Sequence, residues 1–190
     1  PLCEQIAKAV ATGIEFVSPL AGDSARASLP ADATQVLGEL DERVALLSLL
    51  LPEAAGSHYE FILREEIERA DEVRAHYFVA TRFSQPDGTL RALSELQRLV
   101  QRHGPSKRRL LHMLELANFY SELAREYVAA APPESLHFDP AAFQDLVDPA
   151  TQVYEAVASQ DGTPEKLEAA RRLEAFLAFT LQVDRDRFSR

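Results

Sequence analysis

The chain has 190 residues, a formal net charge of −10 and a single cysteine. This length fits one continuous core, so the sequence predicts a single α-helical domain over residues 1–190, either a whole protein or one domain of a longer one. The acidic charge repels phosphate backbones and disfavours nucleic-acid partners. A lone Cys3 excludes an intrachain disulfide and any zinc or iron–sulfur site made of thiolates.

The expected location is intracellular, either cytoplasmic or nuclear. A chain with one cysteine suits a reducing compartment. No segment approaches the ~18 consecutive apolar residues of a membrane span, and the N-terminus has no basic region followed by an apolar run. We therefore expect no membrane span.

Alanine and leucine dominate the apolar residues, which favours helix over strand along most of the chain. Apolar residues from Leu2 to Val17 recur every three or four positions and predict a first helix. The breaker-rich segment Ser18–Pro30 predicts a loop. A second helix is expected from Pro30 to Leu51, ending at Pro52, with its apolar end LLSLLL deeply buried.

The middle of the chain predicts three further helices. Ser57 and Glu60 have the spacing of a capping box, and the pattern that follows should reach Phe83. The turn QPDGT precedes a shorter helix over 90–103. Gly and Pro then stop that helix, and Ser106 is expected to cap the next one.

Proline positions organise the last third of the chain. Asp139-Pro140 and Asp148-Pro149 each join a good N-cap to a proline suited to the first helical turn, so they predict two short helices in succession. Thr163-Pro164 begins a last helix, whose tail from Asp184 should fray. This helix carries an apolar stripe of Leu167, Ala170, Leu173, Phe176, Leu177 and Leu181. The fold class that follows is all-α, an antiparallel helical bundle of about four long helices with two or three shorter ones.

Catalytic and metal-binding patterns are sparse. The sequence has no Gly-x-Ser-x-Gly, phosphate loop or Gly-x-Gly-x-x-Gly, and the Glu-x-x-His motif of di-metal bundles does not occur. The nearest pairs are Glu72 with His76 and His112 with Glu115. We therefore predict no catalytic residues, no metal site and no cofactor, and we favour a protein that is not an enzyme.

Charged residues crowd the helix predicted after Ser57. Opposite charges three or four positions apart suggest a solvated, ion-paired surface. These residues are Arg64, Glu65, Glu66, Glu68, Arg69, Asp71, Glu72 and Arg74.

One tract departs from the acidic character of the chain. Between Arg91 and His112, six lysine and arginine side chains accompany one acidic residue, Glu95. Three of these cations are expected in the first turn of the helix capped by Ser106, where the helix dipole disfavours them and an anion would reverse that penalty. The candidate partner-binding or anion-binding residues are Arg98, Arg102, His103, Ser106, Lys107, Arg108 and Arg109.

Two functions of different classes remain open. The first is a helical protein–protein interaction or scaffold domain that binds an acidic or phosphorylated partner through this basic tract. The alternative is a small-ligand sensor or enzyme with a site between bundle helices. An apolar cavity lined by convergent polar groups would favour the ligand-binding function. A fully packed interior would favour the scaffold function.

Overall fold

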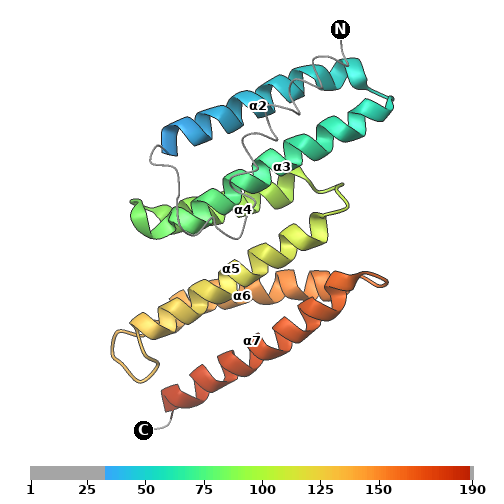
Figure 1. Ribbon diagram of the computed structural model, residues 1–190. Coiled ribbons are helices and arrows are strands. Elements are labelled where there is room, and N and C mark those ends of the chain that lie inside the picture. The colour runs from blue at the N-terminus through green and yellow to red at the C-terminus, as the bar shows by residue number, and fades with distance from the viewer. Residues whose placement is uncertain (1–32, 189–190) are drawn as a thin grey trace. The chain divides into compact units, whose positions relative to one another are not determined.

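The computed structural model describes residues 33–188, and every regular element in this range is helical. The elements are α2 (Ala33–Ala54), α3 (His58–Thr81), the short 3-10 helix η2 (Arg82–Ser84), α4 (Gly88–Arg102), α5 (Arg109–Ala130), α6 (Pro140–Ala158) and α7 (Pro164–Phe188) (Figure 1). The all-α prediction is confirmed for these residues. The predicted first helix, the loop that follows it and Cys3 lie outside the described residues.

Two compact units divide the chain. One comprises residues 1–95 and the other residues 96–190, and the boundary falls within α4. In the first unit α2 and α3 pack against each other, and in the second α6 packs against both α5 and α7. Each unit is described below by itself.

The α2–α3 contact contains the apolar core of the first unit. Its buried cluster consists of Leu47, Leu50, Ala54, Leu63 and Ile67. The three-residue connection between the helices is short enough to make them an antiparallel hairpin, as Figure 1 shows. The hairpin follows from the three- and four-residue spacing of apolar side chains on both helices.

The end of α2 differs from the prediction in two respects. The helix continues through Pro52 to Ala54, because Pro52 lies in the last turn and removes only the bond to the Ser48 carbonyl. The LLSLLL segment is also not buried all round. Leu46 and Leu49 are 44% and 73% exposed, because they lie away from the side of α2 that carries Leu47 and Leu50.

The predicted capping box does not form, because the Ser57 hydroxyl accepts no bond from the Glu60 amide and the Ser57 amide donates to the Ala54 carbonyl, not to Glu60. Glu60 reaches back to accept a hydrogen bond from the Gly56 amide at 2.8 Å, and this bond lowers the pKa of the Glu60 carboxyl. The Ser57 hydroxyl instead donates to the Ala54 carbonyl at 2.6 Å. Ser57 therefore stabilises the end of α2 while it occupies the N-cap position of α3.

Charged residues enter the core of this unit, which corrects the solvated face predicted for α3. Glu66, Glu68, Asp71 and Glu72 are all buried. Glu66 pairs with Arg43 of α2, and it also lies 3.2 Å from Arg69. The spacing of charged residues along α3 does not reveal this burial. A helix that is covered on more than one side buries charged positions as well as apolar ones.

A second ion-pair group joins three helices of the unit. Arg74 of α3 contacts Asp41 of α2, and its Nε donates to Glu95 of α4 at 3.1 Å. The guanidinium also lies over the ring of Phe78, 5.7 Å from the ring centre. Arg74 therefore ties the middle of α4 to the α2–α3 pair.

A tight connection leads from α3 into α4. Asp87 has a φ of 54°, and the Gly88 amide donates to the Gln85 carbonyl at 3.1 Å. A Cβ atom on Gly88 would lie 2.0 Å from the Arg82 carbonyl oxygen. Only glycine fits this close approach of two backbone segments.

In the second unit, α6 is one helix and not the predicted pair. The Asp139 side chain caps it by accepting from the Ala141 amide at 2.9 Å, and Pro149 lies inside the helix. Pro149 removes one backbone bond, but Val147 and Ala150 are buried on both sides of it and hold the helix in place.

Aromatic rings fill the core of this unit. The ring contacts run through Tyr127, Phe138, Phe143, Phe179, Phe176 and Tyr154, with centroids 5.6–6.2 Å apart along this order. The Tyr127 hydroxyl donates to the Asp139 carbonyl and accepts from the Asp139 amide, at 3.1 and 2.8 Å. These contacts fix the start of α6 against α5. Tyr154 donates to Asn118 at 2.8 Å, and burial raises the pKa of its hydroxyl.

The last helix presents a different face to this core than its apolar stripe suggested. Ala169, Phe176 and Val183 are buried, whereas Leu167 and Leu181 are 78% and 70% exposed. The helix also continues to Phe188, beyond the fraying predicted from Asp184. An apolar stripe on α7 is therefore left at the surface.

We expect the substitution Gly88→Ala to destabilise the protein by about 3 kcal/mol, because the added methyl group meets backbone atoms that cannot move aside. The matched control is Gly38→Ala. Gly38 lies exposed inside α2 with no atom near a Cβ, so this change should stabilise by about 0.5–1 kcal/mol. Urea unfolding followed by circular dichroism measures both. Equal effects of the two substitutions would contradict the geometry of the α3–α4 connection.

Replacing one partner of the buried Arg43–Glu66 pair should lower the free energy of unfolding far more than replacing both partners. We expect Glu66→Leu alone to destabilise by about 3–5 kcal/mol, because it leaves the buried Arg43 guanidinium without its carboxylate partner. Arg43→Met should destabilise by less, because Glu66 keeps its contact with Arg69. The double substitution should recover most of that loss in urea unfolding. As a control, Arg64→Ala removes the surface pair with Glu60 and should leave the midpoint almost unchanged. Additive losses in the double variant would refute the coupling.

Candidate functional site

The basic tract predicted as a binding site forms the connection between α4 and α5. Residues 103–108 make a series of turns, in which the Ser106 amide donates to the His103 carbonyl at 3.0 Å and the Arg109 amide donates to Ser106 at 3.2 Å. We call residues 98–109 the basic corner. The structure therefore places the candidate residues on the end of one helix, a turn and the start of the next.

The predicted first turn of α5 is shifted. The Ser106 hydroxyl accepts from the Arg108 amide at 3.0 Å, which closes a local turn before the helix begins. The helix starts at Arg109 with Arg108 as its N-cap, so Lys107 lies outside it. Arg108 and Arg109 still lie at the positive end of the helix dipole, as the sequence argument requires.

Exposure divides the basic corner into two groups. Arg102, Lys107, Arg108 and Arg109 are exposed, whereas Arg98, His103 and Ser106 are partly buried. The four exposed cations occupy eight consecutive positions of a chain whose net charge is −10. This corner can offer several donors to an anionic group at the surface.

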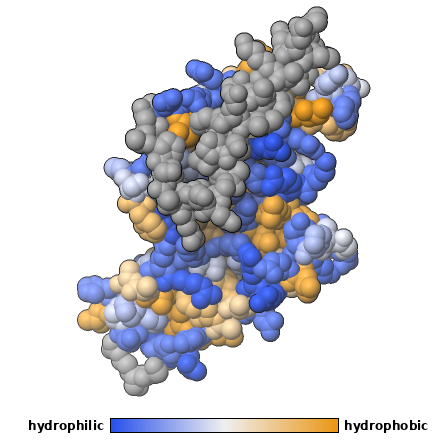
Figure 2. All heavy atoms as spheres, viewed as in Figure 1, coloured by the Kyte–Doolittle hydropathy of each residue, from blue (hydrophilic) through white to orange (hydrophobic). Residues whose placement is uncertain are grey.

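A second candidate surface is the apolar groove on α6 and α7, which the sequence argument missed because it assigned the stripe to the core. The groove is open and measures about 450 Å³. It is lined by Ala158, Ala170, Leu173, Glu174, Leu177, Ala178 and Leu181. Glu174 is its only polar lining residue. Figure 2 shows apolar side chains gathered in patches among polar ones on one face of the protein.

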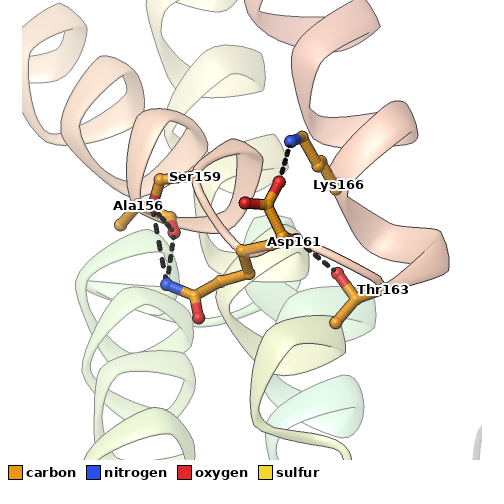
Figure 3. A network of polar contacts seen from close by, with 6 residues as sticks. Ala156, Ser159, Asp161, Thr163 and Lys166 are labelled. Atoms are coloured by element: carbon orange, nitrogen blue, oxygen red, sulfur yellow. Dashed lines mark hydrogen bonds and ion pairs between the residues drawn. The ribbon is translucent and has the colours of Figure 1, made fainter.

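The connection between α6 and α7 supports one end of this groove. Asp161 pairs with Lys166, the Ser159 hydroxyl donates to the Ala156 carbonyl at 2.8 Å, and Thr163 donates to Gln160 at 3.1 Å (Figure 3). The hydrogen bond from Lys166 lowers the pKa of the Asp161 carboxyl. These bonds hold the connection that places Ala158 of α6 beside α7.

Charges along α7 differ in their pairing. Arg172 pairs with Glu168 at 2.7 Å, and Arg187 pairs with Asp184 at 3.4 Å. Arg171 and Glu174 are both exposed on the apolar stripe, and neither forms an ion pair with any residue of 33–188. The exposed stripe therefore carries one cation and one anion, three residues apart, that do not form an ion pair with each other.

The carboxylate–histidine pairs considered from the sequence belong to different units. On α3, Glu72 is buried and His76 is exposed. On α5, His112 is fully buried, with its Nδ1 atom 3.9 Å from a Glu115 carboxylate oxygen. The prediction that the protein has no metal site stays a prediction.

No helix within residues 33–188 is both long enough and apolar enough to cross a membrane.

Comparison with known proteins finds no relative of this chain. No family model, no curated protein and no solved structure matches this chain.

Proposed function

We propose that this chain is a protein–protein interaction domain, with the exposed stripe of α7 as a contact surface. The observation that carries the proposal is the position of Leu167, Leu177 and Leu181, which are 78%, 40% and 70% exposed on one helix. A contiguous apolar surface on a folded unit is typical of a site that another protein covers. The groove beside these leucines supplies a concave part of the same surface.

The composition of the groove favours this function over the small-ligand alternative. Ligand sites combine an enclosed apolar space with a few converging polar groups that fix the ligand. The α6–α7 groove is open, and Glu174 is its single polar residue. Such a surface suits apolar side chains presented by a macromolecule.

The basic corner is proposed as a second contact, for an acidic or phosphorylated segment of a partner protein. Its support is the exposure of Arg102, Lys107, Arg108 and Arg109 close to the N-terminus of α5. Guanidinium groups and first-turn amides both favour anions.

The predictions of a single domain, of a helical bundle and of a cellular location are also proposals. They are one domain over 1–190, an antiparallel bundle of about four long helices, and a cytoplasmic or nuclear location. The single cysteine supports the reducing location, and the short connections of α2–α3 and α6–α7 support antiparallel packing.

A photo-crosslinking amino acid at position 181 tests the contact surface. Leu181 is exposed, so the replacement should leave the fold unchanged. In extract of the source cells, we expect discrete crosslinked products that excess unlabelled chain competes away. The matched control carries the same group in place of exposed Gln152 on α6, outside the groove. If position 181 gives no product above the position 152 control, the proposed function is wrong.

Charge reversal tests the basic corner. We expect Lys107→Glu, Arg108→Glu and Arg109→Glu together to weaken binding of a fluorescent Asp/Glu-rich peptide, with or without phosphoserine, at least tenfold in anisotropy titrations. The fold should survive, because the three side chains are exposed. Wild-type binding should also weaken as salt rises, since exposed charges are screened within ~10 Å at 0.1 M. Equal affinity of the two proteins would show that the corner does not bind anions.

A further inference from the structure

We propose that the stripe on α7 binds a second copy of this chain, through an antiparallel contact about a two-fold axis between Arg171 and Glu174. The inference rests on the proposed function and names the partner of the same surface. It is carried by the spacing of the exposed residues, by the positions of one positive and one negative side chain among them, and by the sizes of the side chains that would face one another.

The spacing on α7 defines two opposite faces. Ala169, Phe176 and Val183 follow one another at seven-residue intervals and are buried in the unit. Leu167, Glu174 and Leu181 follow the same interval on the other side of the helix, and all three are exposed. Ala170 and Leu177 lie three residues after the first two. Within residues 33–188, α7 therefore has one buried face and, opposite it, one exposed face with the same heptad spacing.

The charges select the orientation of the two helices. In a parallel two-fold pair, Arg171 faces the same arginine of the second copy, and Glu174 faces the same glutamate. In an antiparallel pair with the axis midway between them, each Arg171 faces Glu174 of the second copy. Arg171 and Glu174 lie three residues apart on α7 but form no ion pair with each other or with another residue of 33–188. The antiparallel contact gives each of them an oppositely charged side chain of the second copy.

The same axis also matches large side chains with small ones. It places Leu167 opposite Ala178 of the second copy. Leu167 is 78% exposed, and Ala178 lies in the groove wall with Leu177 and Leu181. Each copy therefore offers one projecting leucine and one recess of alanine and leucine, which is the complementarity of knobs-into-holes packing.

The size of the stripe sets the strength of association. From Leu167 to Leu181 it spans about 21 Å at 1.5 Å per residue. A contact of this length between two helices buries less than the ~800 Å² per partner of a standard stable interface. We therefore expect a reversible dimer whose population depends on protein concentration, and not a permanent one.

The test is sedimentation of the purified full chain from about 5 to about 500 µM, where a small interface of this kind associates. We expect a monomer–dimer equilibrium. Arg171→Glu and Glu174→Arg should each weaken the dimer at least tenfold, because each places like charges opposite one another. The double charge swap should restore dimerisation, and a mixture of the two single variants should form a heterodimer. Glu155→Arg, on exposed α6, makes the same charge change as Glu174→Arg and should have no effect.

Three outcomes would overturn the inference. The wild-type chain could remain monomeric over the whole range, the single variants could dimerise as well as the wild type, or the charge swap could fail to restore the dimer. These outcomes are distinct from failure of the proposed function. If the crosslinker at position 181 captures a different protein while the purified chain stays monomeric, only the second-copy inference fails.

Discussion

The buried ion pair between Arg43 and Glu66 is the constraint around which the first unit is arranged. Both side chains are nearly inaccessible to solvent, so neither charge can be hydrated. The Arg43 guanidinium depends on Glu66, and Glu66 has Arg43 and Arg69 as its partners. Burial lowers the pKa of the Arg43 guanidinium, and the neighbouring carboxylate opposes that shift. A sliding of α2 along α3 by one turn would separate the charges while the leucines still found apolar neighbours. The pair therefore fixes the register that the apolar contacts leave open.

That register positions the rest of the unit. With α2 and α3 aligned, Arg74 can reach both Asp41 and Glu95, and so connects a third helix to the first two. The close approach of Gly88 to the Arg82 carbonyl sets the direction in which α4 leaves α3. In the first unit, polar contacts and one glycine thus determine how the helices are aligned. The packing of leucine side chains buries the apolar surface.

In the second unit, aromatic packing has the corresponding role. Phe143 contacts Tyr127, Phe138 and Phe179, so α5, the connection to α6, α6 itself and α7 meet at one ring. The large side chains Phe176 and Phe179 on α7 are turned toward this cluster. Leucines on the far side of the helix are consequently left exposed, and this is the origin of the surface on which the proposed interaction depends.

Much of the fold follows from the sequence alone. Local backbone chemistry, which caps, prolines and glycines encode directly, sets the helix class and several helix boundaries. Examples are the start of α6 at Asp139-Pro140, the start of α7 at Thr163-Pro164 and the end of α4 at Arg102, two residues before Gly104. The basic corner is also visible in the sequence, because its charges are consecutive. What only the tertiary structure decided is which face of each helix is covered. Arg43 and Glu66 carry charges that a surface helix would hold in water, Pro149 carries a ring that usually ends a helix, and Leu167, Leu177 and Leu181 form a stripe suited to a core. The burial of Glu66 and the exposure of the leucines share one physical reason. Periodicity shows that a helix has an apolar side, but only neighbouring helices determine whether that side is buried and what else is buried with it.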